Sequence, residues 1–104
     1  MTEKLFFDVI NEMPNMIESH HNGVLEKQIS LYRGCINNDI NANYHIRNYK
    51  ENKQLNLYLN KITGSVSVNL WDGNEKSEWD KLRQVERVDT ISKEFIYQLI
   101  KKYL

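Results

Sequence analysis

Two segments near the middle of the chain alternate strictly between apolar and polar residues. Every second residue is aliphatic in segments 55–59 and 66–70, which is the period of a strand with one buried face. Gly64 lies between them and suits a turn position with positive φ. A two-residue loop at Thr63 and Gly64 predicts a hairpin in which Leu57 lies opposite Leu70.

The residues before this hairpin extend the pattern into a meander. Segment 44–50 can reach the 55–59 strand through a turn at Glu51 and Asn52. A type I′ turn at Asn38 and Asp39 would place a first strand, within residues 24–35, beside segment 44–50. The predicted pairs are Ile46 with Leu57, Tyr44 with Leu59, Leu31 with Ile46 and Cys35 with Ala42. The sequence therefore predicts a four-stranded antiparallel sheet with one apolar face.

Amphipathic helical patterns flank these strands. Apolar residues recur at three- and four-residue spacing from Leu5 to Ile17, and Pro14 should kink or split that helix. Asn22 and Gly23 are suited to ending it. A second pattern runs from Ile91 to Tyr103, with Ser92 among the residues able to cap it. Both helices can cover the apolar sheet face, so we predict an α+β fold, a two-layer sandwich with N- and C-terminal helices packed on one face.

Residues 75–88 fit two interpretations. Trp79, Leu82 and Val85 follow helical spacing, but 82–88 would also fit as a fifth strand. The predicted last strand has no charge before Asp72 and so lacks the usual protection of a sheet edge. We expect residues 82–88 to cover that edge and to bury Trp79 and Leu82, which favours a monomer. Edge-to-edge pairing of two copies in a homodimer is the alternative.

Composition limits the classes of partner. The chain has 104 residues, with fourteen basic and fourteen acidic side chains, so bulk charge attracts neither nucleic acid nor an anionic membrane. The length fits one domain over residues 1–104. There is no apolar run of membrane-spanning length. The single cysteine, Cys35, and the absence of a signal-peptide pattern predict a cytoplasmic protein.

Catalytic and metal-binding patterns are weak. Three histidines and one cysteine are too few for a four-ligand zinc site. The predicted register places Cys35 and His45 on opposite sheet faces, which argues against a nucleophile and base pair. Carboxylates near Trp71 and Trp79, such as Asp72, are the remaining candidates for a small enzyme. We expect no enzyme, no metal and no cofactor.

The second face of the predicted sheet combines aromatic and polar side chains. Tyr, Trp and Arg dominate the binding energy of protein interfaces, although solvent-facing strands also carry Tyr and Arg because of their β propensity. The predicted registers put Tyr32, His45, Tyr58 and Asn69 in one row of this face, with Ser30, Arg47, Asn56 and Trp71 in the row beside it. The candidate partner-binding residues are Tyr32, His45, Arg47, Tyr49, Tyr58, Asn69 and Trp71.

These observations favour a small non-enzymatic module that binds another protein. The thirteen Asn residues, with many Lys and Ile, indicate AT-rich coding, as in a low-GC bacterium or a mobile element. An inhibitor of the anti-defence or toxin-immunity type, from a phage or mobile element, is the expected role. The alternative is a nucleic-acid-binding regulator that stacks bases on the same face.

Overall fold

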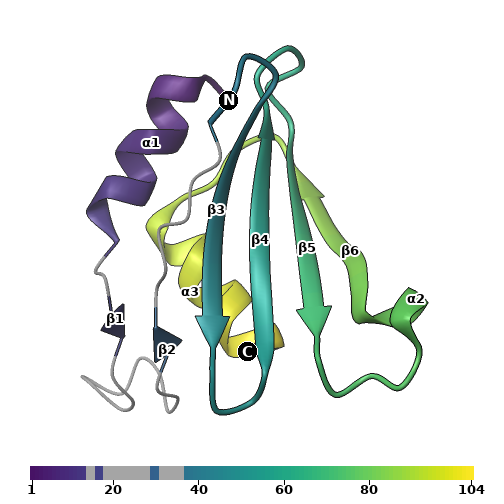
Figure 1. Cartoon of the computed structure of the whole chain (residues 1–104). Helices are drawn as coiled ribbons and strands as arrows, with labels where there is room; N and C mark the ends of the chain where they lie inside the picture. Colours follow the sequence, from purple (N-terminus) through teal and green to yellow (C-terminus); the bar gives the residue numbers. More distant parts are fainter. Residues whose placement is uncertain (14–15, 18–28, 31–36) are drawn as a thin grey trace.

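A computed structural model describes residues 1–13, 16–17, 29–30 and 37–104 (Figure 1). Within these residues the strands form one antiparallel sheet in the order β1-β2-β3-β4-β5-β6. The elements are α1 (Glu3–Glu12), β1 (Met16–Ile17), β2 (Ile29–Ser30), β3 (Asn41–Asn48), β4 (Lys53–Asn60), β5 (Val66–Asp72), α2 (Glu78–Lys81), β6 (Leu82–Val88) and α3 (Lys93–Tyr103).

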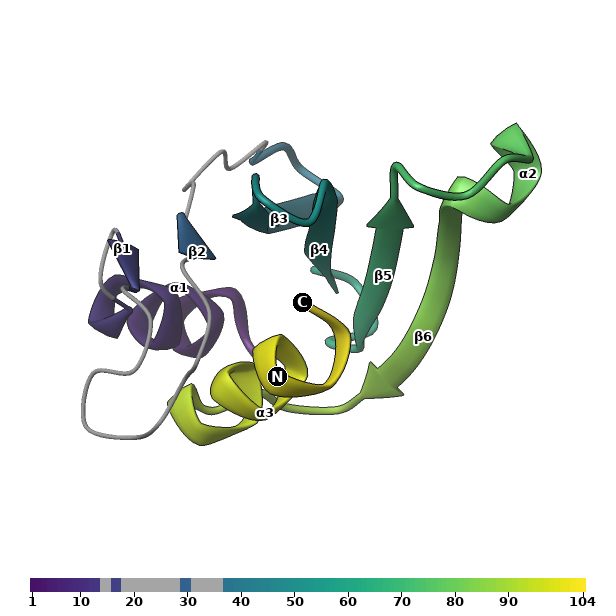
Figure 2. The same cartoon turned by 90° about the horizontal axis from the view of Figure 1, so that it is seen from below.

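The two long helices pack on the same face of the sheet, which curves around α3 (Figure 2). The core combines aliphatic residues of β3, β4 and β5 with apolar residues of both helices. Its fully enclosed members include Phe6, Tyr44, Leu57, Val68 and Ile96, each 0% exposed. The predicted α+β fold with terminal helices on one face is confirmed. The described sheet has two strands more than the predicted four, because β6 is added at one edge and the short β1 at the other.

Helix α1 is shorter than predicted. Thr2 caps it by accepting a hydrogen bond from the backbone nitrogen of Leu5 at 3.2 Å. The helix ends at Glu12, and Met13 is already extended because a residue before proline disfavours the helical conformation. The prediction that the helical pattern continued to Ile17 was wrong, since Met16–Ile17 pairs with β2. Asn22 and Gly23 lie outside the described residues.

The hairpin between β4 and β5 has a longer loop than predicted. Asn60 donates to the carbonyl of Ser65 at 2.9 Å, so four residues lie between this pair. Gly64 has the expected positive φ, at 76°. The strands are therefore shifted by two residues, and Leu57 pairs with Val68 instead of Leu70.

The same shift occurs between β3 and β4. Asn48 pairs with Lys53 across a four-residue turn whose last residue, Asn52, has φ 54°. The predicted turn at Glu51 and Asn52 was too short, so Tyr44 lies opposite Leu57 and Ile46 opposite Leu55. A shift of two residues keeps every side chain on its predicted face.

The register of the first predicted strand is correct at one end only. Ser30 pairs with Arg47, which is the register predicted for Leu31 and Ile46. At the other end Asn37, not Cys35, bridges to Ala42. Asn38 shapes this turn, since its side-chain oxygen accepts hydrogen bonds from the backbone nitrogens of Ile40 at 2.9 Å and Asn41 at 2.8 Å. Asn38 does not have the positive φ of a type I′ turn, so the predicted turn type was wrong. Leu31 and Cys35 themselves lie outside the described residues.

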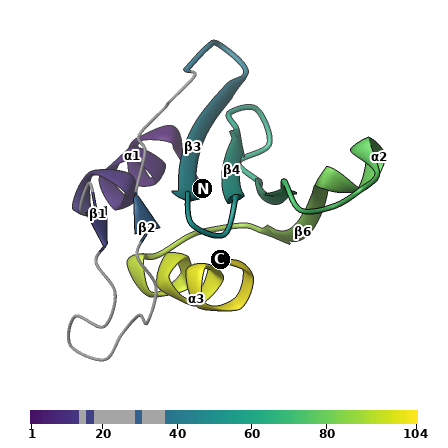
Figure 3. The same ribbon diagram turned by 60° about the horizontal axis from the view of Figure 1, so that its bottom comes forward.

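Residues 75–88 form both a short helix and a strand. After α2, strand β6 pairs with β5 from Val88 to Leu82, with a register shift opposite Val68 and Asn69. This confirms that β6 covers the edge of β5 within the chain. The expected burial was wrong. Trp79 is 93% exposed because α2 projects away from the helical layer (Figure 3), and Leu82 is 52% exposed because it lies opposite Trp71 on the face away from the helices.

Helix α3 follows the predicted pattern. The Ser92 side chain accepts a hydrogen bond from Phe95 N at 3.1 Å, and Ile96, Leu99 and Ile100 are buried. The far end of α3 is joined to β3 through Asn48, whose amide donates to the carbonyl of Leu104 at 2.9 Å. Asn48 is 2% exposed, so this hydrogen bond satisfies a polar group at the edge of the core.

Candidate functional site

The outer face of the sheet, defined here as the side of β3 to β6 that points away from α1 and α3 (Figure 2), carries most of the predicted site. Directly opposed residues of antiparallel strands share a face, so the pairing assigns its members. They are Asn41, Asn43, His45, Arg47, Gln54, Asn56, Tyr58, Asn60, Ser67, Asn69, Trp71, Leu82, Gln84 and Arg87. Five predicted residues are among them, Tyr49 lies in the adjoining turn, and Tyr32 lies outside the described residues.

Arg47 is the centre of a cluster at the lower end of this face. Its guanidinium carbon lies 5.1 Å from the centre of the Tyr49 ring and 5.2 Å from that of the Trp71 ring. Because Trp71 belongs to β5, the Arg47 side chain must reach across β4. Two amide oxygens accept its hydrogen bonds, Gln54 Oε1 at 3.4 Å and Asn52 Oδ1 at 3.2 Å. We call these five residues the Arg47 cluster.

The turns around the Arg47 cluster are tied together. Gly73 donates its backbone N–H to the carbonyl of Asn52 at 2.9 Å, and Asn74 Nδ2 donates to the carbonyl of Glu51 at 2.8 Å. A Cβ atom at position 73 would lie 2.2 Å from Asn52 Nδ2 and 2.6 Å from Trp71 Cη2. Glycine is therefore needed there for the Asn52 and Trp71 side chains to keep their places.

The remaining predicted residues lie in separate rows. His45 lies opposite Asn56 and then Asn69, whereas Tyr58 lies opposite Asn43 and Ser67. The prediction that His45, Tyr58 and Asn69 share one row was therefore wrong, as a result of the two-residue shift. Arg47 and Trp71 do share a row, with Gln54 between them instead of the predicted Asn56.

Amide side chains connect these rows. Gln54 Nε2 donates to Asn56 Oδ1 at 2.7 Å, and both Asn43 and Asn56 are 6% exposed. Asn43 Oδ1 is buried, and no hydrogen-bond partner for it lies among the described residues. Over β3, β4 and β5 the outer face is therefore a layer of partly or fully buried amides and aromatic rings, whereas its β6 residues Leu82, Gln84 and Arg87 are exposed.

The position of His45 in this layer disfavours its charged form. Partial burial lowers the pKa of His45 from the ordinary 6.5, because removing an imidazolium from water disfavours the charged form. It contributes hydrogen-bonding capacity, not charge, to the outer face.

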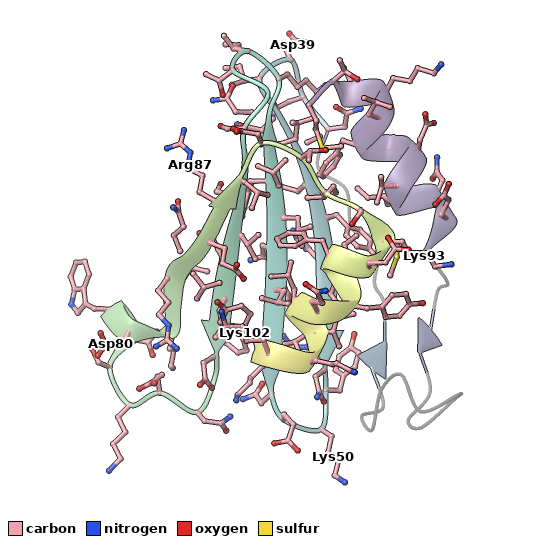
Figure 4. The ribbon with its side chains drawn as sticks, turned by 180° about the vertical axis from the view of Figure 1, so that it is seen from behind. Asp39, Lys50, Asp80, Arg87, Lys93 and Lys102 are labelled. Carbon is pink, nitrogen blue, oxygen red and sulfur yellow. The ribbon has the colours of Figure 1, made fainter. Side chains whose placement is uncertain are left out.

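The charges of the outer face are all positive. Arg47 and Arg87 belong to it, and no carboxylate occupies any of its strand positions. Figure 4 shows Arg87 pointing away from β6 into solvent. The acidic side chains of the described strands lie elsewhere, for example Glu86 opposite Val68 on the helix-covered face. A chain with net charge +0 thus presents a locally positive surface here.

Sequence reasoning missed several members of the site. Asn52 and Gln54 hold Arg47, yet nothing in the alternation marks them, because their contact depends on the length of the turn. Trp79 was predicted to be buried for its size, but it is the most exposed of the large hydrophobic residues described. The exposure of Trp79 could have been predicted from its neighbours in the sequence, because Glu78, Asp80 and Lys81 are all charged.

The described part of the chain contains no grouped metal ligands, and the candidate carboxylate Asp72 belongs to a turn. No three His, Cys, Asp or Glu side chains of this part of the chain are grouped as metal ligands. The Asp72 carboxylate is engaged in its own turn, where Oδ1 accepts from Asn74 N at 2.9 Å and from Asn74 Nδ2 at 3.1 Å. Its role there is to shape the turn after β5.

Comparison with protein-family models, curated proteins and solved structures found no match to the chain. Among the helices of the described segments, none has the length and apolar character needed to cross a membrane.

Proposed function

We propose that this is a non-enzymatic module that binds another protein through the outer face. The observation that carries the proposal is the Arg47 cluster, in which the arginine lies over two aromatic rings, at 5.1 and 5.2 Å from their centres. Arginine, tryptophan and tyrosine are the residues that most often dominate interface energies. Side chains that are already ordered lose less conformational entropy on binding, so the cluster is suited to act as an anchor.

The charge of the face favours a protein over a nucleic acid. Affinity for nucleic acid comes mainly from several phosphate contacts, whereas the outer face offers two guanidinium groups across four strands. Amides and aromatic rings make up most of the remainder and can pair with the mixed polar surface of a protein. A nucleic-acid-binding regulator that stacks bases on Trp71 and Tyr49 is the second candidate, supported by the 62% exposure of Tyr49.

The role that we propose for this binding is inhibition of the partner inside the cytoplasm, in the manner of phage or mobile-element inhibitors. Part of the support is the composition, since the chain is short and rich in Asn and has one cysteine. The rest is the Arg47 cluster, which is suited to contact another protein.

Site-specific photocrosslinking tests the proposal. Benzoylphenylalanine is placed at Asn69, in the middle of the outer face, or at Gln98, an exposed position of α3 on the other side of the molecule. Irradiation in cells of the source organism should join the Asn69 variant to a discrete protein and leave the Gln98 variant uncrosslinked. Arg47→Gln combined with the Asn69 probe should reduce the yield.

Two results would count against the proposal. One is crosslinking with equal yield from Asn69 and Gln98, which would mean that the outer face is not the contact surface. The other is tight binding of oligonucleotides that weakens steeply between about 50 mM and about 200 mM salt, as phosphate contacts require. That second result would favour the nucleic-acid-binding regulator.

A further inference from the structure

The Arg47 guanidinium is fixed in place but has only neutral described partners. A guanidinium has five N–H donors, and two of them reach amide oxygens at 3.4 and 3.2 Å. No carboxylate of the described residues lies within the 4.0 Å of an ion pair to it. Arg47 is partly buried, and among the described residues no anion replaces the hydration that its charge loses.

The geometry of the guanidinium suits a carboxylate. Its two amide contacts are longer than the 2.7–2.9 Å typical of an N–H group donating to a carboxylate, so they orient the group without satisfying its charge. The Tyr49 and Trp71 rings hold the planar group, and a fixed planar fork can donate two parallel hydrogen bonds to one carboxylate.

We infer that Arg47 is the receptor for an acidic side chain, Asp or Glu, on the surface of the partner protein. This inference rests on the proposed function and specifies which chemistry the partner must present. Arg87, the only other charge on the described strand positions of the outer face, lies two rows away opposite Ser67, so the inference concerns the single acidic side chain that faces Arg47. The Arg47 cluster therefore selects partners by charge as well as by shape.

A fluorescence titration tests the inference without the partner. Trp79→Phe leaves Trp71 as the single tryptophan, and the exposed position 79 makes that change harmless to folding. The probe is capped hexaglutamate, with capped hexaglutamine as its control. Hexaglutamate should change Trp71 emission because the ring lies 5.2 Å from the guanidinium, and hexaglutamine should not.

Matched variants locate the binding group. In Arg47→Gln the dissociation constant for hexaglutamate should rise about tenfold, as expected for the loss of one charge-assisted pair. Arg87→Gln makes the same charge change on the same face and should raise it less than about threefold. Arg47→Lys keeps the charge but not the planar fork, and should bind more weakly than the wild type while folding normally.

The outcomes separate this inference from the proposed function. Equal losses in Arg47→Gln and Arg87→Gln, or no response to hexaglutamate, would overturn the inference. A crosslink from Asn69 would then still support protein binding by the outer face. Tighter binding of oligothymidylate than of hexaglutamate would overturn both, because phosphates would then be the natural ligand.

Discussion

Two residues with positive φ, Asn52 and Gly64, end the two four-residue hairpin loops on either side of β4. Their φ values are 54° and 76°, in the left-handed region that glycine and asparagine tolerate best. Each returns the chain into the next strand, so these two positions set the registers of β3, β4 and β5. The sequence indicated this role for Gly64 but not the loop length that goes with it.

Gly64→Ala should destabilise the protein by about 1–2 kcal/mol, the usual cost of a left-handed conformation for a residue with Cβ. The added atom would also lie 2.9 Å from the backbone nitrogen and oxygen of Met1, so relief by a local shift is limited. Urea unfolding measures the change. Ile62→Ala in the same loop is the control, because Ile62 is 78% exposed and should stay within about 0.5 kcal/mol. Equal effects of the two changes would contradict the role of Gly64.

His45 should make folding stability depend on pH. Because the pKa of His45 is lowered in the folded protein, the unfolded chain takes up a proton at a higher pH. The stability that neutral His45 contributes is therefore fully present above about pH 6.5, the ordinary pKa of the unfolded chain. It is lost as the pH falls from there through the lower pKa of the folded protein. His45→Gln should reduce this loss, measured by urea unfolding at about pH 7.5 and about pH 5.5. An unchanged pH dependence in His45→Gln would show that other groups cause it.

At the scale of elements, alternation identified the strands and their faces but not their registers. Moving a strand by two residues leaves each side chain on its face, so Leu57 is buried whether Leu70 or Val68 lies opposite. The choice between the two registers depends on the backbone conformations of the loops at Asn52 and Gly64. The pattern of apolar residues carries no information about the energies of those conformations. Face assignment was therefore predictable, and cross-strand neighbours were not.

The two ends of the sheet show another limit of sequence periodicity. Met16 and Ile17 fit the helical spacing that begins at Leu5, yet they pair as strand β1 because the helix has already ended before Pro14. Residues 82–88 fit helix and strand alike, and pairing with β5 decided between them. Tertiary contacts outweighed local preference at both places.

Adjacent residues of β4 test the assignment of the faces. Leu57→Ala should cost about 2–5 kcal/mol, because Leu57 is 0% exposed and its removal leaves a cavity in the core. Tyr58→Ala, on the outer face, should cost about 1 kcal/mol or less. Thermal and urea unfolding of both variants give the comparison. Losses of equal size would mean that the sheet is covered on both sides and that the outer face is interior.

At the scale of the whole molecule, the sequence identified the composition of the candidate site but not its arrangement. Five of the seven predicted residues lie on the outer face, because alternation alone places them there. The contact of Arg47 with Tyr49 and Trp71 depends on the turn at Asn52 and on the absence of a side chain at Gly73. Those two features are local backbone geometry, which residue type signals only weakly.

The edge of the sheet at β6 bears on whether the molecule associates with itself through strand pairing. We expect a monomer at all concentrations by light scattering, because Arg83, Glu86 and Arg87 line β6, and its register shift at Val68 and Asn69 also disfavours pairing with another edge.

Replacing those three charged residues by Thr should cause concentration-dependent association, since Trp79 and Leu82 lie exposed at the same edge. Adding Trp79→Ser to that triple variant separates two causes: association that persists comes from strand pairing, and association that disappears comes from the apolar flank. A wild-type protein that already forms dimers would contradict the argument, because the charges on β6 would then be part of a contact instead of a barrier to one.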